Sequence, residues 1–140
     1  MDRKVRIAVL WLMVMLGGLV HTIVEIMPIF WGDDVAAMPQ NEAQMHGMMI
    51  FSACFFLTLP ALGELCTLYG CRRWATIANA VLAGLMLLLN TAHPIMDLAG
   101  APIAQWFILP VVFALNLLLF IDALKVCRNN CKGRIAVRVV

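Results

Sequence analysis

Three histidines and two acidic residues of this chain have the chemistry to bind a metal ion. His21 and Glu25 are four residues apart, as are His93 and Asp97, and His46 is the third histidine. In a helix, a spacing of four puts two side chains on one face, so each pair could hold one ligand. Imidazole binds zinc, copper, iron and nickel, and carboxylate offsets the charge of the cation. We therefore interpret these five residues as candidate ligands of a transition metal.

The same histidines allow other interpretations. His21 with His93, or His21 with His46, could be the two axial ligands of a b-type haem. A quinone head group or a proton pathway could use the same polar groups. Each carboxylate could also accept the second ring N–H of its histidine instead of binding the metal itself. In the least specific interpretation, the polar residues only pack helices together, because H-x-x-x-E is not a distinctive motif.

The cysteines suggest a second, weaker candidate site. Cys66, Cys71, Cys127 and Cys131 all fall near the basic ends of two apolar segments, where four thiolates could hold a soft metal. Their spacings, C-x4-C and C-x3-C, differ from the C-x2-C of common zinc sites. Cysteine is also an ordinary small residue of buried helices, which is the favoured interpretation here. We expect no disulfides, because that side should be reducing.

The elements that must position these residues are long and apolar. Hydrophobic residues make up 64% of the 140-residue chain and charged residues 13%, whereas soluble domains are about a quarter charged. Four apolar segments each reach the roughly 20 residues that a membrane-spanning helix needs: residues 5–30, 43–69, 74–92 and 103–126. Short links make consecutive helices antiparallel. We predict an all-α integral membrane protein with one domain over residues 1–140, an antiparallel up-and-down bundle of four transmembrane helices.

Every lysine and arginine falls on one side of this arrangement. They precede the first span, separate spans two and three, or follow the fourth: Arg3, Lys4, Arg6, Arg72, Arg73, Lys125, Arg128, Lys132, Arg134 and Arg138. Basic residues mark the cytoplasmic side of membrane proteins. We therefore expect both termini in the cytoplasm, residues 127–140 as a basic cytoplasmic tail, and a bacterial inner membrane as the simplest location.

The three histidines are expected in one layer near the extracytoplasmic face. At ~1.5 Å per residue, His21 lies roughly 22 Å beyond Arg6, in the outer part of a ~30 Å hydrocarbon core. The same estimate from Arg73 places His93 near the outer boundary, and His46 lies in the early turns of span two. A proline directly after His93 could, however, end the third helix there.

For the other polar residues of the spans we expect structural roles, in helix packing, in ion pairs or at the membrane interface. Helix three has a stripe at spacings of three and four: Asn79, Ala83, Met86, Asn90, His93 and Asp97. Near the basic end, Asp122 is expected to pair with Lys125, and Glu64 with Arg72 or a neighbouring basic residue. The four tryptophans require no cofactor, and three of them fall near span ends, as an aromatic belt predicts.

Several function classes are excluded. The basic residues form no surface interleaved with aromatic residues, so nucleic-acid binding is not expected, and no phosphate-binding loop or dinucleotide fingerprint is present.

Metal uptake, transfer or sensing is our first hypothesis for the function of the chain. The alternatives are a redox or lipid-modifying enzyme and a non-catalytic accessory subunit, so enzymatic activity stays open. A chain this short is expected to form a homodimer or join a larger membrane complex, with Gly17-Gly18 and Ala83-Gly84 as places of close helix approach.

Overall fold

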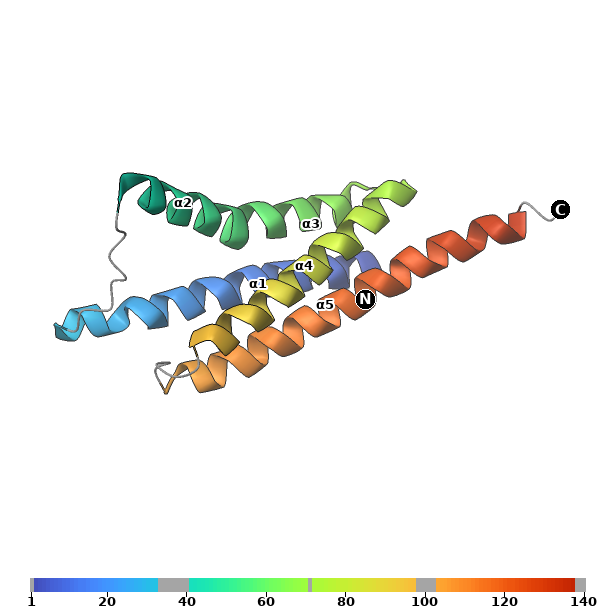
Figure 1. Cartoon of the computed structure of the whole chain (residues 1–140). Coiled ribbons are helices and arrows are strands. Elements are labelled where there is room, and N and C mark those ends of the chain that lie inside the picture. Colours follow the sequence, from blue (N-terminus) through green and yellow to red (C-terminus); the bar gives the residue numbers. More distant parts are fainter. Residues whose placement is uncertain (1, 33–40, 71, 98–102, 138–140) are drawn as a thin grey trace.

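The computed structural model describes residues 2–32, 41–70, 72–97 and 103–137, with the side chains of 93–97 and 130–137 left out. The described residues are all-helical (Figure 1). Four stretches are long and apolar enough to cross a membrane, namely Arg3–Trp31, Glu42–Leu68, Arg73–Ala92 and Gln105–Asn129. The predicted four long apolar helices in a bundle are thereby confirmed. The elements are α1 Arg3–Ile26, η1 Met27–Trp31, α2 Glu42–Ala53, η2 Cys54–Thr58, α3 Leu59–Leu68, α4 Arg73–Asp97 and α5 Gln105–Val137.

Side-chain caps begin the first two spans. Asp2 accepts the backbone N–H of Lys4, and Asn41 accepts that of Gln44 at 2.8 Å, which satisfies N–H groups that have no partner within the helix. Two helices run further than the expected spans. The helix of the fourth span, α5, continues past residue 126 to Val137, so most of the expected tail is helical. The helix of the third span, α4, continues through the proline after His93 to Asp97.

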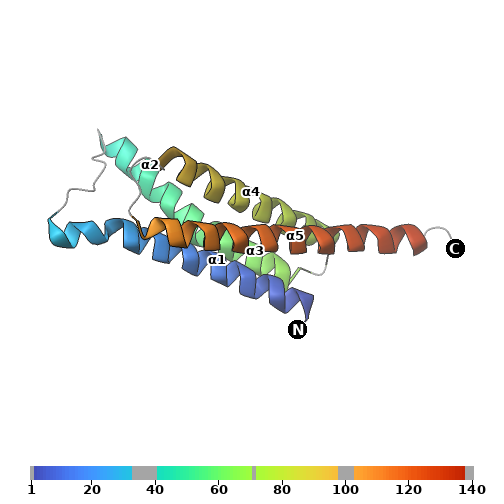
Figure 2. The ribbon, with the colours of Figure 1, turned by 90° about the horizontal axis from the view of Figure 1, so that it is seen from below.

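Neighbours in the chain are neighbours in the bundle. α1 packs on α3 and α5, and α4 packs on α3 and α5, which closes a ring in which α1 and α4 are diagonal. The ribbons of successive spans run in opposite directions, and both chain ends lie at one end of the molecule (Figures 1 and 2). Lys4, Arg6, Arg72, Arg73 and Lys125 belong to this end, which we call the basic end.

Small residues allow close packing of these helices. A Cβ at Gly17 would lie 2.9 Å from Val112 of α5, and one at Gly84 would lie 3.1 Å from Phe120 of the same helix. At the predicted places of close approach, Gly17-Gly18 and Ala83-Gly84, the neighbouring helix therefore belongs to the same chain. The buried apolar core gathers around them: Ile7, Trp11, Val14, Phe55, Ala80, Ala83, Met86, Leu119 and Ala123.

The second span divides into two parts with different surroundings. Residues 54–58 form a π-helix, η2, and only Leu59 separates it from Pro60. Proline lacks an N–H, and its ring collides with the carbonyl four residues earlier, so a wider turn makes room for it. Thr58 donates its hydroxyl to the Ala53 carbonyl at 3.3 Å. Beyond this turn α3 packs on α1 and α4, whereas α2 contacts its own continuation and every residue of α2 is exposed.

An ion pair joins the first and last spans near the basic end. Arg6 donates from Nη2 to Asp122 Oδ1 at 2.6 Å, and the Asp122 side chain is largely buried. The expected pairing of Asp122 with Lys125 is therefore wrong. Arg6 is on α1, which packs along α5, so a partner distant in sequence replaces the nearby one. Glu64 has no ion pair to Arg72 among the described residues.

Candidate functional site

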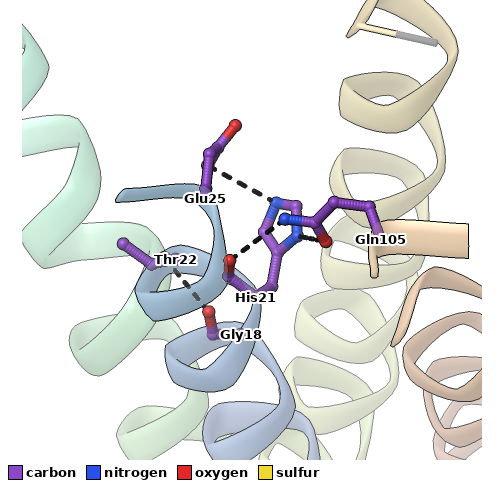
Figure 3. A network of polar contacts seen from close by, with 5 residues as sticks. All are labelled: Gly18, His21, Thr22, Glu25 and Gln105. Carbon is purple, nitrogen blue, oxygen red and sulfur yellow. Dashed lines mark hydrogen bonds and ion pairs between the residues drawn. The ribbon is translucent and has the colours of Figure 1, made fainter. Parts of the chain in front are cut away.

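His21 is attached to the fourth span by two contacts with one side chain (Figure 3). Its Nδ1 lies 2.5 Å from Gln105 Oε1, and Gln105 Nε2 donates to the His21 carbonyl oxygen at 3.2 Å. The carbonyl oxygen can only accept, so the amide nitrogen must face it and the amide oxygen must face the ring. His21 Nδ1 is therefore the donor, and the proton of a neutral ring is on Nδ1.

The other ring nitrogen of His21 faces Glu25. His21 Nε2 lies 3.8 Å from Glu25 Oε2, one helical turn away on the same face of α1 (Figure 3). The exposed fraction is 13% for the His21 side chain and 46% for that of Glu25. Nε2 therefore lies in a sheltered position beside a carboxylate that has room to move.

This arrangement matches one half of a metal site. Histidines that bind metals usually donate their second ring N–H to an oxygen acceptor, which fixes the ring orientation and the tautomer. Gln105 fills that role for His21. Gln105 was not among the residues predicted for the site. The sequence feature that could have identified it is its position at the start of the fourth span, at the membrane depth expected for His21.

The structure brings two of the five predicted ligands together. His21 and Glu25 face each other, whereas His46 is on the exposed α2, away from the packed part of the bundle. His93 and Asp97 are in the last turns of α4, and their side chains lie outside the described part. Among the described residues, no group of three or more histidine, cysteine, aspartate or glutamate side chains could hold a metal. The haem pairs of His21 with His46 and of His21 with His93 stay predictions.

The predicted thiolate site is described only in part. Cys66 and Cys127 are half-buried, and both are free thiols, as is the exposed Cys54 in the second span. Cys71 and the side chain of Cys131 lie outside the described residues. The four-cysteine site therefore stays a prediction.

A second polar contact lies in the core and was not expected from the sequence. Trp11 donates its indole N–H to Asn79 Oδ1 at 2.8 Å, and both side chains are buried. This bond links the diagonal helices α1 and α4. Asn79, Ala83 and Met86 of the predicted stripe are all buried, so the first half of that stripe faces the interior.

Comparison of the chain with protein-family models, with curated proteins and with solved structures gave no match.

Proposed function

We propose that this chain is an integral membrane protein that binds a transition metal ion at the extracytoplasmic end of its bundle, for uptake, transfer or sensing. His21 Nε2 and the Glu25 carboxylate supply the first two ligands. The observation that carries the proposal is the pair of contacts with Gln105, because it puts the ring proton on Nδ1 and leaves Nε2 facing Glu25.

The distance between the two groups fits a metal after a small adjustment. With metal–ligand bonds of about 2.0–2.1 Å, two ligands of a tetrahedral site are roughly 3.3–3.4 Å apart. The present separation of 3.8 Å needs the Glu25 side chain to shift by about half an ångström, which an exposed side chain makes without disturbing the core.

A complete site needs further ligands. Four-coordinate sites use three or four protein groups, with water in an open position. The sequence-predicted ligands on α4, His93 and Asp97, are the candidates for the remaining positions. His46 would join them if α2 approached α1.

Metal analysis of purified protein tests the proposal. We expect the full-length chain in detergent to retain zinc, copper, iron or nickel after loading and desalting. His21→Ala should abolish retention, and Glu25→Gln should weaken it. Gln105→Leu leaves the ligands in place but frees the ring, so affinity should fall about 10- to 100-fold.

Glu64→Gln is the matched control for Glu25→Gln, because it neutralises a carboxylate of the second span that belongs to no proposed ligand set. It should retain metal like the unchanged protein. Retention by His21→Ala at the unchanged level, or failure of the unchanged protein to bind any of the four metals, would contradict the proposal. A visible Soret band in the purified protein would favour haem instead.

An accessory role in a larger complex is a second candidate, favoured by the exposure of α2. This helix carries Glu42, His46 and Ser52 among its apolar residues, yet each of its residues is exposed and, among the described residues, it has no extensive contact with another span. A polar residue in hydrocarbon is costly unless it faces protein or water. Co-purification of another membrane protein in a fixed ratio would support this role, and a monomer after mild detergent extraction from its native membrane would contradict it.

A further inference from the structure

A partly polar pocket opens among the four spans at the basic end, at the opposite end of the bundle from His21. Its volume is about 280 Å³. All four spans contribute to its lining, which includes Lys4, Ile7, Thr67, Thr76, Asn79 and Val126. A cavity of this size has room for an ionic group larger than a water molecule.

Asn79 supplies a fixed hydrogen-bond donor to this pocket. The residue is 3% exposed, and its Oδ1 accepts the indole N–H of Trp11. The orientation of the amide is thereby set, because the indole can only donate. In the described part of the chain Nδ2 donates to no protein atom, and Asn79 borders the pocket. Nδ2 is therefore available to an acceptor in the pocket, because the amide oxygen already faces Trp11.

The charge of the pocket is positive. Lys4 is in the lining and no carboxylate is. The nearby Asp122 is engaged by Arg6, and Asp2 caps the Lys4 backbone N–H. Thr67 and Thr76 donate their hydroxyl protons to backbone carbonyls of Gly63 and Arg73. Among the lining side chains, Lys4 and Asn79 are therefore the strong hydrogen-bond donors that remain for a bound group, beside the weakly donating thiol of Cys66.

We propose that this pocket binds a phosphate group, held by the Lys4 ammonium and the Asn79 amide. A phosphate offers several strong acceptor oxygens, and an ammonium is a common partner for it. Two sources share this chemistry: the head group of a phospholipid in the leaflet at the basic end, and free inorganic phosphate. Basic clusters at a membrane surface attract anionic lipids. The site is independent of the proposed metal site.

Trp11 provides a built-in reporter of binding, because its indole bonds to the same amide. In the full-length chain, Trp31, Trp74 and Trp106 are all well exposed, and changing them to phenylalanine leaves Trp11 as the one tryptophan. Its fluorescence is then titrated in detergent with three probes: phosphatidylglycerol, diacylglycerol without phosphate, and inorganic phosphate.

We expect a saturable change with phosphatidylglycerol and none with diacylglycerol. A change with inorganic phosphate as well, or with inorganic phosphate alone, keeps the phosphate site and identifies the free ion as a source. No saturable change with either phosphate probe overturns the proposal.

Two variants and one control test the assigned donors. Asn79→Asp keeps an oxygen for Trp11 but replaces the donor with a negative acceptor, so binding should be lost. Lys4→Gln should weaken binding about tenfold, as expected for one charge-assisted hydrogen bond. Lys125→Gln removes an exposed charge at the same end outside the pocket lining and should leave binding unchanged. Equal weakening by Lys4→Gln and Lys125→Gln, or unchanged binding by Asn79→Asp, also overturns the proposal.

Discussion

The indole ring of Trp11 packs directly against Gly63, so the core has no room for a side chain at that glycine. A Cβ at Gly63 would lie 2.2 Å from the indole ring, far inside van der Waals contact. We expect Gly63→Ala to destabilise the protein by about 1–3 kcal/mol, as overpacked cores do. Thermal unfolding of the detergent-solubilised protein measures this.

Gly47 provides the matched control, since it is also a helical glycine but nothing lies within 4 Å of an added Cβ. Gly47→Ala should leave stability unchanged or raise it by up to about 1 kcal/mol, the helix-propensity difference. Equal effects of the two substitutions would show that the contact between Trp11 and Gly63 does not form.

The ion pair of Arg6 with Asp122 should contribute to the docking of α1 on α5. Removing a largely buried carboxylate leaves the guanidinium without its partner, so Asp122→Asn should cost about 1–3 kcal/mol in thermal unfolding. Glu64→Gln is the control, because Glu64 has no ion pair within the described residues. In a double mutant with Arg6→Gln the two losses should not add, and full additivity would refute the pairing.

The residues of the candidate site were predictable where they are close in sequence. The four-residue spacing of His21 and Glu25 predicted that they share a helix face, and the 3.8 Å separation agrees. Gln105 and Arg6 act across α1 and α5, and no local spacing indicates which residues two distant helices bring together. Lys125 was predicted as the partner of Asp122 because sequence spacing indicates only partners on the same helix.

At the level of elements, hydrophobic length predicted all four long helices, because about 20 apolar residues exceed what an ordinary buried helix needs. Their packing was less predictable. The π-helix accommodates Pro60 within the second span. The separation of α2 from the bundle depends on tertiary packing, which no local sequence pattern indicates. The exposure of α2 placed His46 apart from His21.

The separation of α2 predicts unequal local stability within one span. Amide hydrogens open by local unfolding, and helices with few packing contacts open most readily. We expect hydrogen exchange in residues 42–53 to be on average about tenfold faster than in residues 59–68, which pack on α1 and α4. Mass spectrometry of peptides from the full-length protein in detergent measures the difference. Equal protection of both segments would mean that α2 is packed as firmly as α3.

At the scale of the whole molecule, the distribution of charge predicts how the bundle lies in a membrane. Residues 7–71 and 74–124 contain no lysine or arginine, so both links at the end opposite the basic end lack positive charge. Since basic residues stay in the cytoplasm, alkaline phosphatase inserted after Gly32 should be active in a bacterial host. The same enzyme fused to the C-terminus should be inactive, and a C-terminal green fluorescent protein should fluoresce. The reverse pattern would place His21 and Glu25 at the cytoplasmic face, where the proposed metal would come from inside the cell.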